Sequence, residues 1–170
     1  LIGINAFYPL AEHDSASAIE QMIGGRRVAA DLERFANEQR KPILLSEVGY
    51  TTRKDTAIRP WEWPDGMVDV VIDEQAQADA YAALLAPLTE RASIAGFFVW
   101  RYYADPDDVS QEAEWGYSPR GKRAEVVLRD IFNAQLAADR EPLPGWLAGR
   151  HRARRPWRYG WEGSPPLFAP

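Results

Sequence analysis

The sequence predicts an α/β fold in which parallel strands alternate with amphipathic helices. Three apolar segments have the composition of buried strands, and an amphipathic segment follows each one: 1–10 then 26–40, 42–50 then 74–92, and 94–100 then 118–136. A strand followed by a helix, three times in series, is typical of βαβ units. We therefore expect parallel strands at about 2–8, 43–48 and 95–101, joined by right-handed crossovers.

The first strand should end at Pro9, because proline cannot donate a hydrogen bond to a sheet. Ser15 or Ser17 can cap a short helix after it, and Gly24-Gly25 is a typical helix stop. A second helix is then expected from Arg26 to Arg40.

The second strand contains the most informative residue, Glu47. Ile43-Leu44-Leu45 is a continuous apolar run after Pro42, and such a run should not end in a carboxylate. At the carboxyl end of a buried parallel strand, Glu47 lies where α/β proteins bind ligands. The alternative is a strand-end glutamate that simply faces water. The long loop after it, residues 51–72, indicates a functional segment.

The third strand runs into Trp100, and an acidic loop (105–114) follows. Ser118 as N-cap with Pro119 at the first helical position predicts the start of the last helix. Beyond residue 138 the helical periodicity stops. We expect one domain over 1–138 and a tail rich in Pro, Trp and Arg over 139–170.

The composition excludes several functions. A net charge of −5 argues against a nucleic-acid partner, and no apolar run is long enough to span a membrane. There is no cysteine, and His13 and His151 are far apart, so no metal motif is present and no cofactor is expected. The chain opens abruptly with Leu1 inside an apolar run, and we expect it to be part of a longer polypeptide.

Four blocks of the sequence resemble glycoside hydrolase family 113, a family of retaining TIM-barrel enzymes related to the β-mannanases. These blocks are Gly3 to Pro9, Lys41 to Tyr50 with its Ser46-Glu47-Val48-Gly49-Tyr50 motif, Gly96 to Trp100, and Gly116 to Lys122. The resemblance implies that the three units are strands six to eight of a (β/α)₈ barrel, its C-terminal half. It also implies an oligosaccharide or polysaccharide substrate and an N-terminal half as partner.

The resemblance assigns roles to individual residues. It implies that Glu47 is the catalytic nucleophile, that the Tyr8 hydroxyl donates a hydrogen bond to it, and that Trp100 is the floor of a sugar subsite. Further substrate-binding candidates are Asn5, Trp61, Trp63 and Tyr102. The general acid/base of the family has no counterpart, because strands one to five are absent from these 170 residues.

Two alternatives stay open at this stage. Trp61 and Trp63 either stack on sugars or fix their own loop to the barrel. The whole chain is either part of a retaining glycoside hydrolase or a non-catalytic carbohydrate-binding or scaffold module derived from a barrel. Localisation is also open, since export would require a signal peptide before Leu1.

Overall fold

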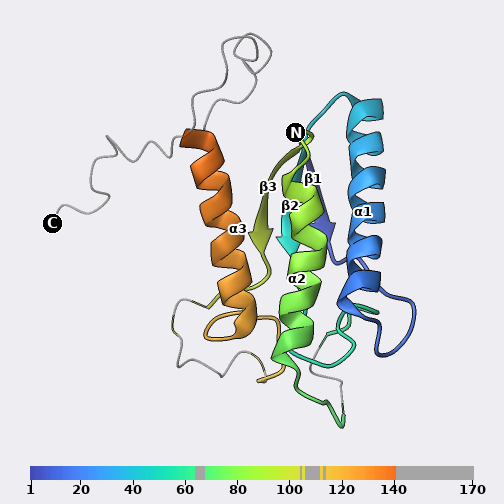
Figure 1. Ribbon diagram of the computed structural model, residues 1–170, viewed down its shortest axis with the longest axis vertical. Helices are drawn as coiled ribbons and strands as arrows, with labels where there is room; N and C mark the ends of the chain where they lie inside the picture. Colours follow the sequence, from blue (N-terminus) through green and yellow to red (C-terminus); the bar gives the residue numbers. More distant parts are fainter. Residues whose placement is uncertain (64–67, 104, 106–111, 113, 141–170) are drawn as a thin grey trace, which may run out of the picture. The chain divides into compact units, whose positions relative to one another are not determined.

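The computed structural model describes residues 1–63, 68–103, 105, 112 and 114–140 (Figure 1). Its elements, in chain order, are β1 (Ile2–Ala6), α1 (Ala18–Gln39), β2 (Ile43–Val48), α2 (Glu74–Thr89), β3 (Ile94–Val99) and α3 (Arg123–Arg140). None of the helices within these ranges is long and apolar enough to cross a bilayer.

The three strands form one sheet in the order β1-β2-β3, and both pairings are parallel. This confirms the predicted α/β fold with a parallel sheet. Each strand ends within about two residues of its expected limits. Consecutive parallel strands with a helix between them bring all three carboxyl ends to the same edge of the sheet, which is the edge where the predicted site residues follow.

One face of the sheet packs against the helices. Ile43, Leu45 and Val48 are fully buried in a core that includes residues of α1, α2 and the first turns of α3. In Figure 1, α2 crosses in front of the sheet with α1 beside it, and α1 and α2 are in direct contact. The sheet is therefore covered on one side by its own crossover helices.

The other face of the sheet is open in the described part of the chain. Gly3 and Asn5 on β1 are exposed, and Phe98 on β3 keeps 53% of its surface accessible. Leu44 on the central strand is only half-buried, although its neighbours Ile43 and Leu45 are fully buried. A central strand of a complete α/β fold is buried on both faces, so this face is where further structure would pack.

The prediction that Gly24-Gly25 stops a first helix is wrong. α1 runs without a break from Ser17, whose side chain forms a capping box with Glu20, through both glycines to Gln39. The glycines serve close packing instead. A Cβ on Gly24 would clash with the carbonyl of Leu10, and a Cβ on Gly25 would clash with the carbonyl of Ala83 on α2. Their helix-breaking tendency is outweighed by the contact they permit.

The last helix also begins later than expected. Ser118 and Pro119 form a turn in which Lys122 donates a backbone hydrogen bond to Pro119, and α3 starts only at Arg123. Gly121 adopts a φ of +73°, a conformation outside the right-handed helix that favours glycine. The helical start signal at Ser118 is therefore overridden by Gly121.

The structure divides into two compact units, Leu1–Asn133 and Ala134–Pro170. Almost all of the expected tail, 139–170, lies outside the described residues. The expected boundary between residues 138 and 139 therefore stays a prediction.

Candidate active site

Three residues predicted for the site lie at the carboxyl-end edge of the sheet. Asn5 on β1 is the register partner of Glu47 on β2. Trp100 follows β3, and its backbone N–H donates to the carbonyl of Val48 at 2.7 Å. The end of each strand is thus fixed to its neighbour by backbone pairing, which places Glu47 between the other two.

A β-bulge adjusts the position of Glu47. The register between β1 and β2 shifts by one residue, so that Leu45 pairs with Ile4 and Glu47 with Asn5. The extra residue, Ser46, donates a hydrogen bond from its hydroxyl to the Asn5 side-chain oxygen at 2.9 Å. Bulges are frequent next to active sites because they re-aim side chains. Here the bulge falls one residue before the half-buried Glu47.

Tyr8 lies just beyond β1 and is half-buried. Its backbone carbonyl accepts a hydrogen bond from the Tyr50 hydroxyl at 2.8 Å, and burial raises the pKa of its phenol. Among the described residues, no hydrogen bond joins the Tyr8 hydroxyl to the Glu47 carboxylate, although sequence reasoning expects one. The structure therefore holds the Tyr8 backbone in place without forming the expected contact.

Trp100 belongs to an aromatic group around Arg101. The Arg101 guanidinium carbon lies 5.9 Å from the centre of the Trp100 ring, 5.2 Å from that of Trp63 and 5.0 Å from that of Tyr103. The peptide bond between Trp100 and Arg101 is cis. Two tryptophans far apart in the sequence are thus brought to one place by an arginine that sequence analysis did not single out.

The two tryptophans of the long loop differ. Trp63 packs on Tyr117, with ring centres 5.9 Å apart, and keeps 45% of its surface exposed. Trp61 is 55% exposed. For Trp63 the contact with Tyr117 supports the interpretation that it fixes its loop, and sugar stacking by the exposed part of the ring stays a prediction. For Trp61 the exposure leaves the sugar-stacking interpretation as a prediction.

Tyr102 makes its contacts in another direction. Its hydroxyl donates to the Glu125 carboxylate on α3, and its ring lies against the Arg120 guanidinium at 5.5 Å. The Glu125 hydrogen bond raises the pKa of Tyr102. These contacts tie Tyr102 to the start of α3, so its predicted role in substrate binding draws no support from them.

A buried polar network beneath the strand ends was missed by sequence reasoning. Gln77 on α2 is fully buried, and its side-chain amide donates to the carbonyls of Tyr50 at 2.8 Å and Tyr117 at 3.1 Å. Buried polar groups are stable only when hydrogen-bonded, so this amide joins the loops after β2 and β3. A glutamine within the apolar stripe of α2 is the signal that was available in the sequence.

Lys122 also joins the loop after β2 to the loop after β3. Its ammonium donates to the Thr52 hydroxyl at 2.6 Å and to the Glu114 carbonyl at 2.8 Å. Burial lowers the pKa of Lys122. The Gly116–Lys122 block thus holds the loop after β3 against the loop after β2.

The long loop after β2 is held by Arg53. Its guanidinium donates to the carbonyl of Arg59 at 3.0 Å and pairs with the Glu62 carboxylate at 3.0 Å. The Tyr117 hydroxyl donates to the carbonyls of Pro60 and Glu62. The segment that carries Trp61 and Trp63 is therefore an ordered part of the site.

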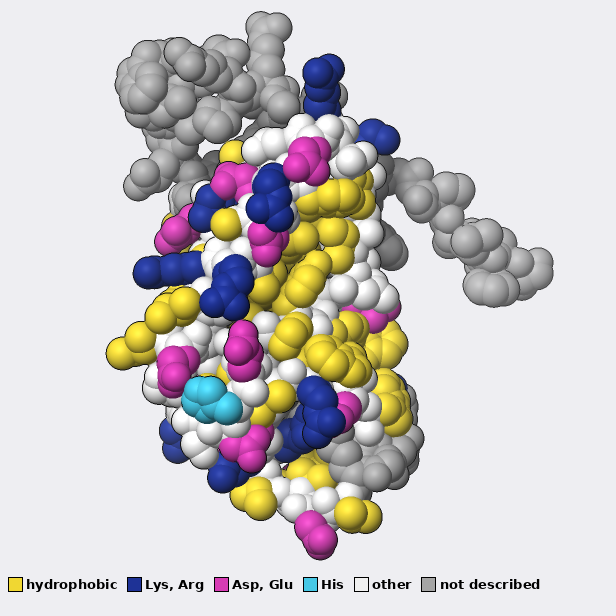
Figure 2. Space-filling view, turned by 90° about the vertical axis from the view of Figure 1, so that its right-hand side faces the viewer, with side chains coloured by type: hydrophobic (Ala, Val, Ile, Leu, Met, Phe, Trp, Pro, Cys, Tyr) yellow, Lys and Arg dark blue, Asp and Glu magenta, His cyan; other side chains and the backbone are white. Residues whose placement is uncertain are grey.

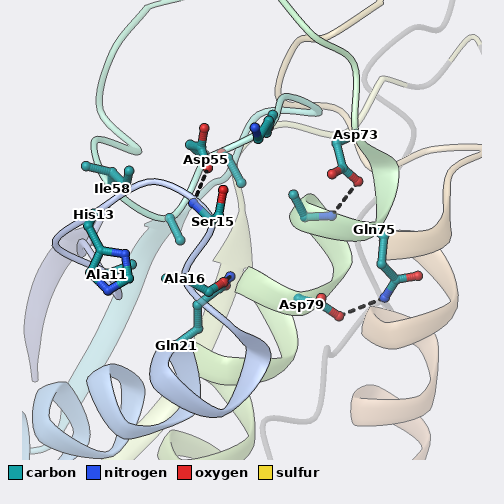
Figure 3. Close-up of a pocket in the computed structure, with 14 residues that line it drawn as sticks. Ala11, His13, Ser15, Ala16, Gln21, Asp55, Ile58, Asp73, Gln75 and Asp79 are labelled. Atoms are coloured by element: carbon teal, nitrogen blue, oxygen red, sulfur yellow. Dashed lines mark hydrogen bonds between the residues drawn. The ribbon is translucent and has the colours of Figure 1, made fainter.

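A cavity of about 220 Å³ lies elsewhere, between the loop before α1 and the start of α2 (Figure 3). Its polar wall includes Ser15, Asp55 and Asp79. Asp55 accepts from the Ser15 backbone and Asp79 from Gln75. None of the predicted site residues lines this cavity, and within the described ranges no cluster of His, Cys, Asp and Glu could hold a metal ion.

Comparison with known proteins agrees with this geometry. The model of Glycoside Hydrolase Family 113 matches residues 1–122. The carboxyl edge of a parallel sheet is where barrel enzymes place their active sites, and the chain belongs to glycoside hydrolase family 113. This confirms the resemblance that the sequence motifs indicate. No curated protein matches the chain.

Solved structures show the same fold. One is a β-mannanase of this family from Alicyclobacillus acidocaldarius in complex with ManMIm, with 23% identity and a TM-score of 0.58. Another is a β-1,4-mannanase of this family, with 24% identity and a TM-score of 0.59. In both cases the match covers 78% of this chain and 38% of the other protein. The chain therefore spans about two-fifths of the length of these enzymes.

Proposed function

We propose that the chain forms strands six to eight of the (β/α)₈ barrel of a retaining glycoside hydrolase that cleaves β-1,4-linked mannan or a related polysaccharide. The family and the two mannanase structures support the reaction class and the substrate class. The position of Glu47 at the carboxyl edge of β2, between Asn5 and Trp100, is the observation that carries the proposal.

The chemistry requires two carboxyl groups, and Glu47 supplies one of them. In the first step the Glu47 carboxylate attacks the anomeric carbon, the glycosidic C–O bond breaks, and the leaving oxygen takes a proton from a general acid. In the second step the group that acted as general acid, now deprotonated, acts as a base and removes a proton from water. The water attacks the anomeric carbon and releases Glu47. The acid/base comes from the barrel strands that precede β1, on a part of the protein outside these 170 residues.

The remaining residues bind and orient the sugar in this proposal. Trp100 offers an apolar indole face to the C–H surface of the ring. Asn5 is oriented by the Ser46 hydroxyl and can hydrogen-bond a sugar hydroxyl at the edge of the sheet. The Tyr8 hydroxyl approaches Glu47 when the barrel and the substrate are in place, since catalytic hydrogen bonds often tighten only in the complex.

The experiment is carried out in the complete enzyme, with the companion barrel strands supplied in the same polypeptide. Glu47→Gln keeps the shape of the side chain and removes the attacking charge. Turnover of β-mannan should fall by a factor on the order of 10⁴ or more, while binding of manno-oligosaccharides survives. Glu38→Gln is the matched control, because Glu38 is an exposed residue of α1.

The outcomes separate the two function classes. A wild-type protein that binds manno-oligosaccharides without any turnover would replace the enzyme by the carbohydrate-binding module. Near-normal turnover in Glu47→Gln would leave the enzyme class standing and remove Glu47 as the nucleophile.

A further inference from the structure

Arg101 occupies the centre of the aromatic group at the strand ends. Its guanidinium carbon lies within 6 Å of the ring centres of Trp63, Trp100 and Tyr103, at 5.2, 5.9 and 5.0 Å. These distances are those of cation–π interactions. Trp63 comes from the loop after β2 and Trp100 from the end of β3, so Arg101 bridges two separate segments of the site.

Glu112, in the loop after β3, forms an ion pair with Arg101. The Arg101 Nε atom is 3.5 Å from a Glu112 carboxylate oxygen, and the Glu112 side chain is only 6% exposed. The second oxygen of Glu112 accepts the backbone N–H of Ser118 at 2.6 Å. Gly116 lies so close to the Glu112 carboxyl group that a Cβ would clash with it. Glu112 is thus held at one oxygen by the Ser118 backbone, while its other oxygen faces the Arg101 guanidinium.

The arrangement leaves sugar-binding surface available. Trp63 keeps 45% of its surface exposed and Trp100 is half-buried, although both rings contact Arg101. A planar guanidinium can lie against several rings and keep its ion pair at the same time, which a lysine ammonium cannot do equally well. The cation thus sets the spacing and tilt of the two indoles without covering them.

We propose that Arg101 is a positioning residue that fixes Trp63 and Trp100 relative to each other, so that the two indoles form one wall for a β-linked hexose chain. The proposal rests on the proposed function for its ligand. It assigns Trp63 to the same sugar-binding surface as Trp100, and it gives the ion pair between the partly buried Arg101 and the buried Glu112 side chain a role in substrate affinity.

A ligand-free measurement tests the positioning itself. The chain contains seven tryptophans, and ¹⁵N-labelling with Trp63→Phe and Trp100→Phe variants assigns their indole N–H signals. In the complete enzyme, Arg101→Met should shift or broaden the signals of both Trp63 and Trp100, and Arg101→Lys should give a smaller change. Arg91→Met is the matched control, since Arg91, in the turn after α2, forms a partly exposed ion pair with Glu33 on α1.

Kinetics then test the consequence for the substrate. Arg101→Met should raise KM for manno-oligosaccharides about fivefold or more and leave kcat within about twofold, because the wall binds sugar without taking part in bond breaking. Where Arg101→Met does not fold, Glu112→Gln replaces it, because that change removes the anchoring charge and keeps the arginine.

The outcomes distinguish this inference from the proposed function. Unchanged signals of both indoles in Arg101→Met overturn the positioning role. A shift of only one of the two indole N–H signals in Arg101→Met overturns the proposal that Trp63 and Trp100 form one wall. If Arg101→Met shifts both indole signals but the wild-type protein binds no manno-oligosaccharide, the result supports the positioning role and counts against the mannanase assignment.

Discussion

Tyr117 holds two loops of the site together through a single hydroxyl. It donates to the carbonyls of Pro60 at 2.6 Å and Glu62 at 3.0 Å, and its ring contacts Phe7 and Trp63. The residue is almost fully buried. The pKa of Tyr117 is raised to about 12, and burial is the largest cause of this shift.

The raised pKa has a defined effect on stability. An unfolded tyrosine loses its proton near pH 10, whereas folded Tyr117 keeps it to about pH 12. The folded state therefore binds more protons in this window, and the contribution of Tyr117 to stability is complete below about pH 10 and is lost as the pH rises toward 12. Burial raises the pKa of Tyr8, Tyr50 and Tyr81 as well, so they act in the same direction.

Tyr117→Phe tests this account. At pH 7 the variant should lose about 1–2 kcal/mol of unfolding free energy, because two loop carbonyls lose their donor. The difference from wild type should shrink as the pH rises from about 10 to 12. Urea unfolding followed by circular dichroism at several pH values measures both effects. A difference that stays constant up to pH 12 would show that the phenol titrates normally.

The sequence predicts some residues of the candidate site and not others. Glu47 is predictable because Pro42 and Gly49 delimit a continuous apolar strand, and the carboxylate interrupts the pattern. Arg101 and Glu112 are not, because their roles depend on contacts between loops that sequence periodicity does not report. The acidic loop appears in the sequence as several equivalent carboxylates, and the fold pairs one of its described residues, Glu112, with Arg101.

Among the elements, α1 shows how packing outweighs a local signal. Its two glycines read as a helix stop, but Gly25 faces the carbonyl of Ala83 on α2 so closely that no Cβ fits. Figure 2, which views the molecule from the side of α1, shows charged side chains among hydrophobic ones on this surface. Ile19 and Ile23 are among its exposed apolar residues.

Gly25→Ala measures this close packing. At an exposed helical site the change would stabilise by roughly 1 kcal/mol, but here the two helices must separate, at a cost of about 3 kcal/mol. Thermal unfolding should therefore show a lower Tm. Ala30→Gly, at an exposed position of α1, serves as a control and should cost about 1 kcal/mol. A Gly25→Ala variant as stable as wild type would contradict the contact.

The element types and their order follow from the sequence, whereas two element boundaries do not. Strand positions are predictable because the apolar runs are short and, for the first two, are delimited by Pro9 and by Pro42 and Gly49. The start of α3 is not, because Ser118-Pro119 is a strong helix start and Gly121 overrides it through its backbone conformation. The continuity of α1 through its two glycines is not predictable either, because Gly24 packs against Leu10 and Gly25 against Ala83 on α2, contacts that helical periodicity does not report.

Within the described residues of the unit Leu1–Asn133, the parallel sheet carries helices on one face, and its other face is open. Phe98 is 53% exposed on β3, and the chain covers 38% of the length of the mannanase structures it matches. We propose that companion barrel strands cover this face in the complete enzyme. Sequence patterns alone predict the arrangement of the three units, but the open face becomes visible only in the structure.

Phe98→Ala tests the covering of this face. In the isolated chain the change should alter the unfolding free energy by about 0.5 kcal/mol or less, because the side chain is exposed. In the complete enzyme it should cost about 3 kcal/mol or more, because a buried ring is lost. Val126→Ala on α3, 46% exposed, should have an equally small effect in both proteins. Equal effects of Phe98→Ala in both would place the companion strands elsewhere.

The central claim is that Glu47 attacks the anomeric carbon, and trapping the covalent intermediate tests it most directly. A 2-deoxy-2-fluoro-mannoside with a good leaving group reacts rapidly in the first step, while the fluorine slows hydrolysis of the resulting ester. Digestion and mass spectrometry of the inactivated complete enzyme should find one sugar ester, on Glu47, in the peptide that carries Ser46-Glu47-Val48. An ester on any other carboxylate, with Glu47 unmodified, would contradict the assignment.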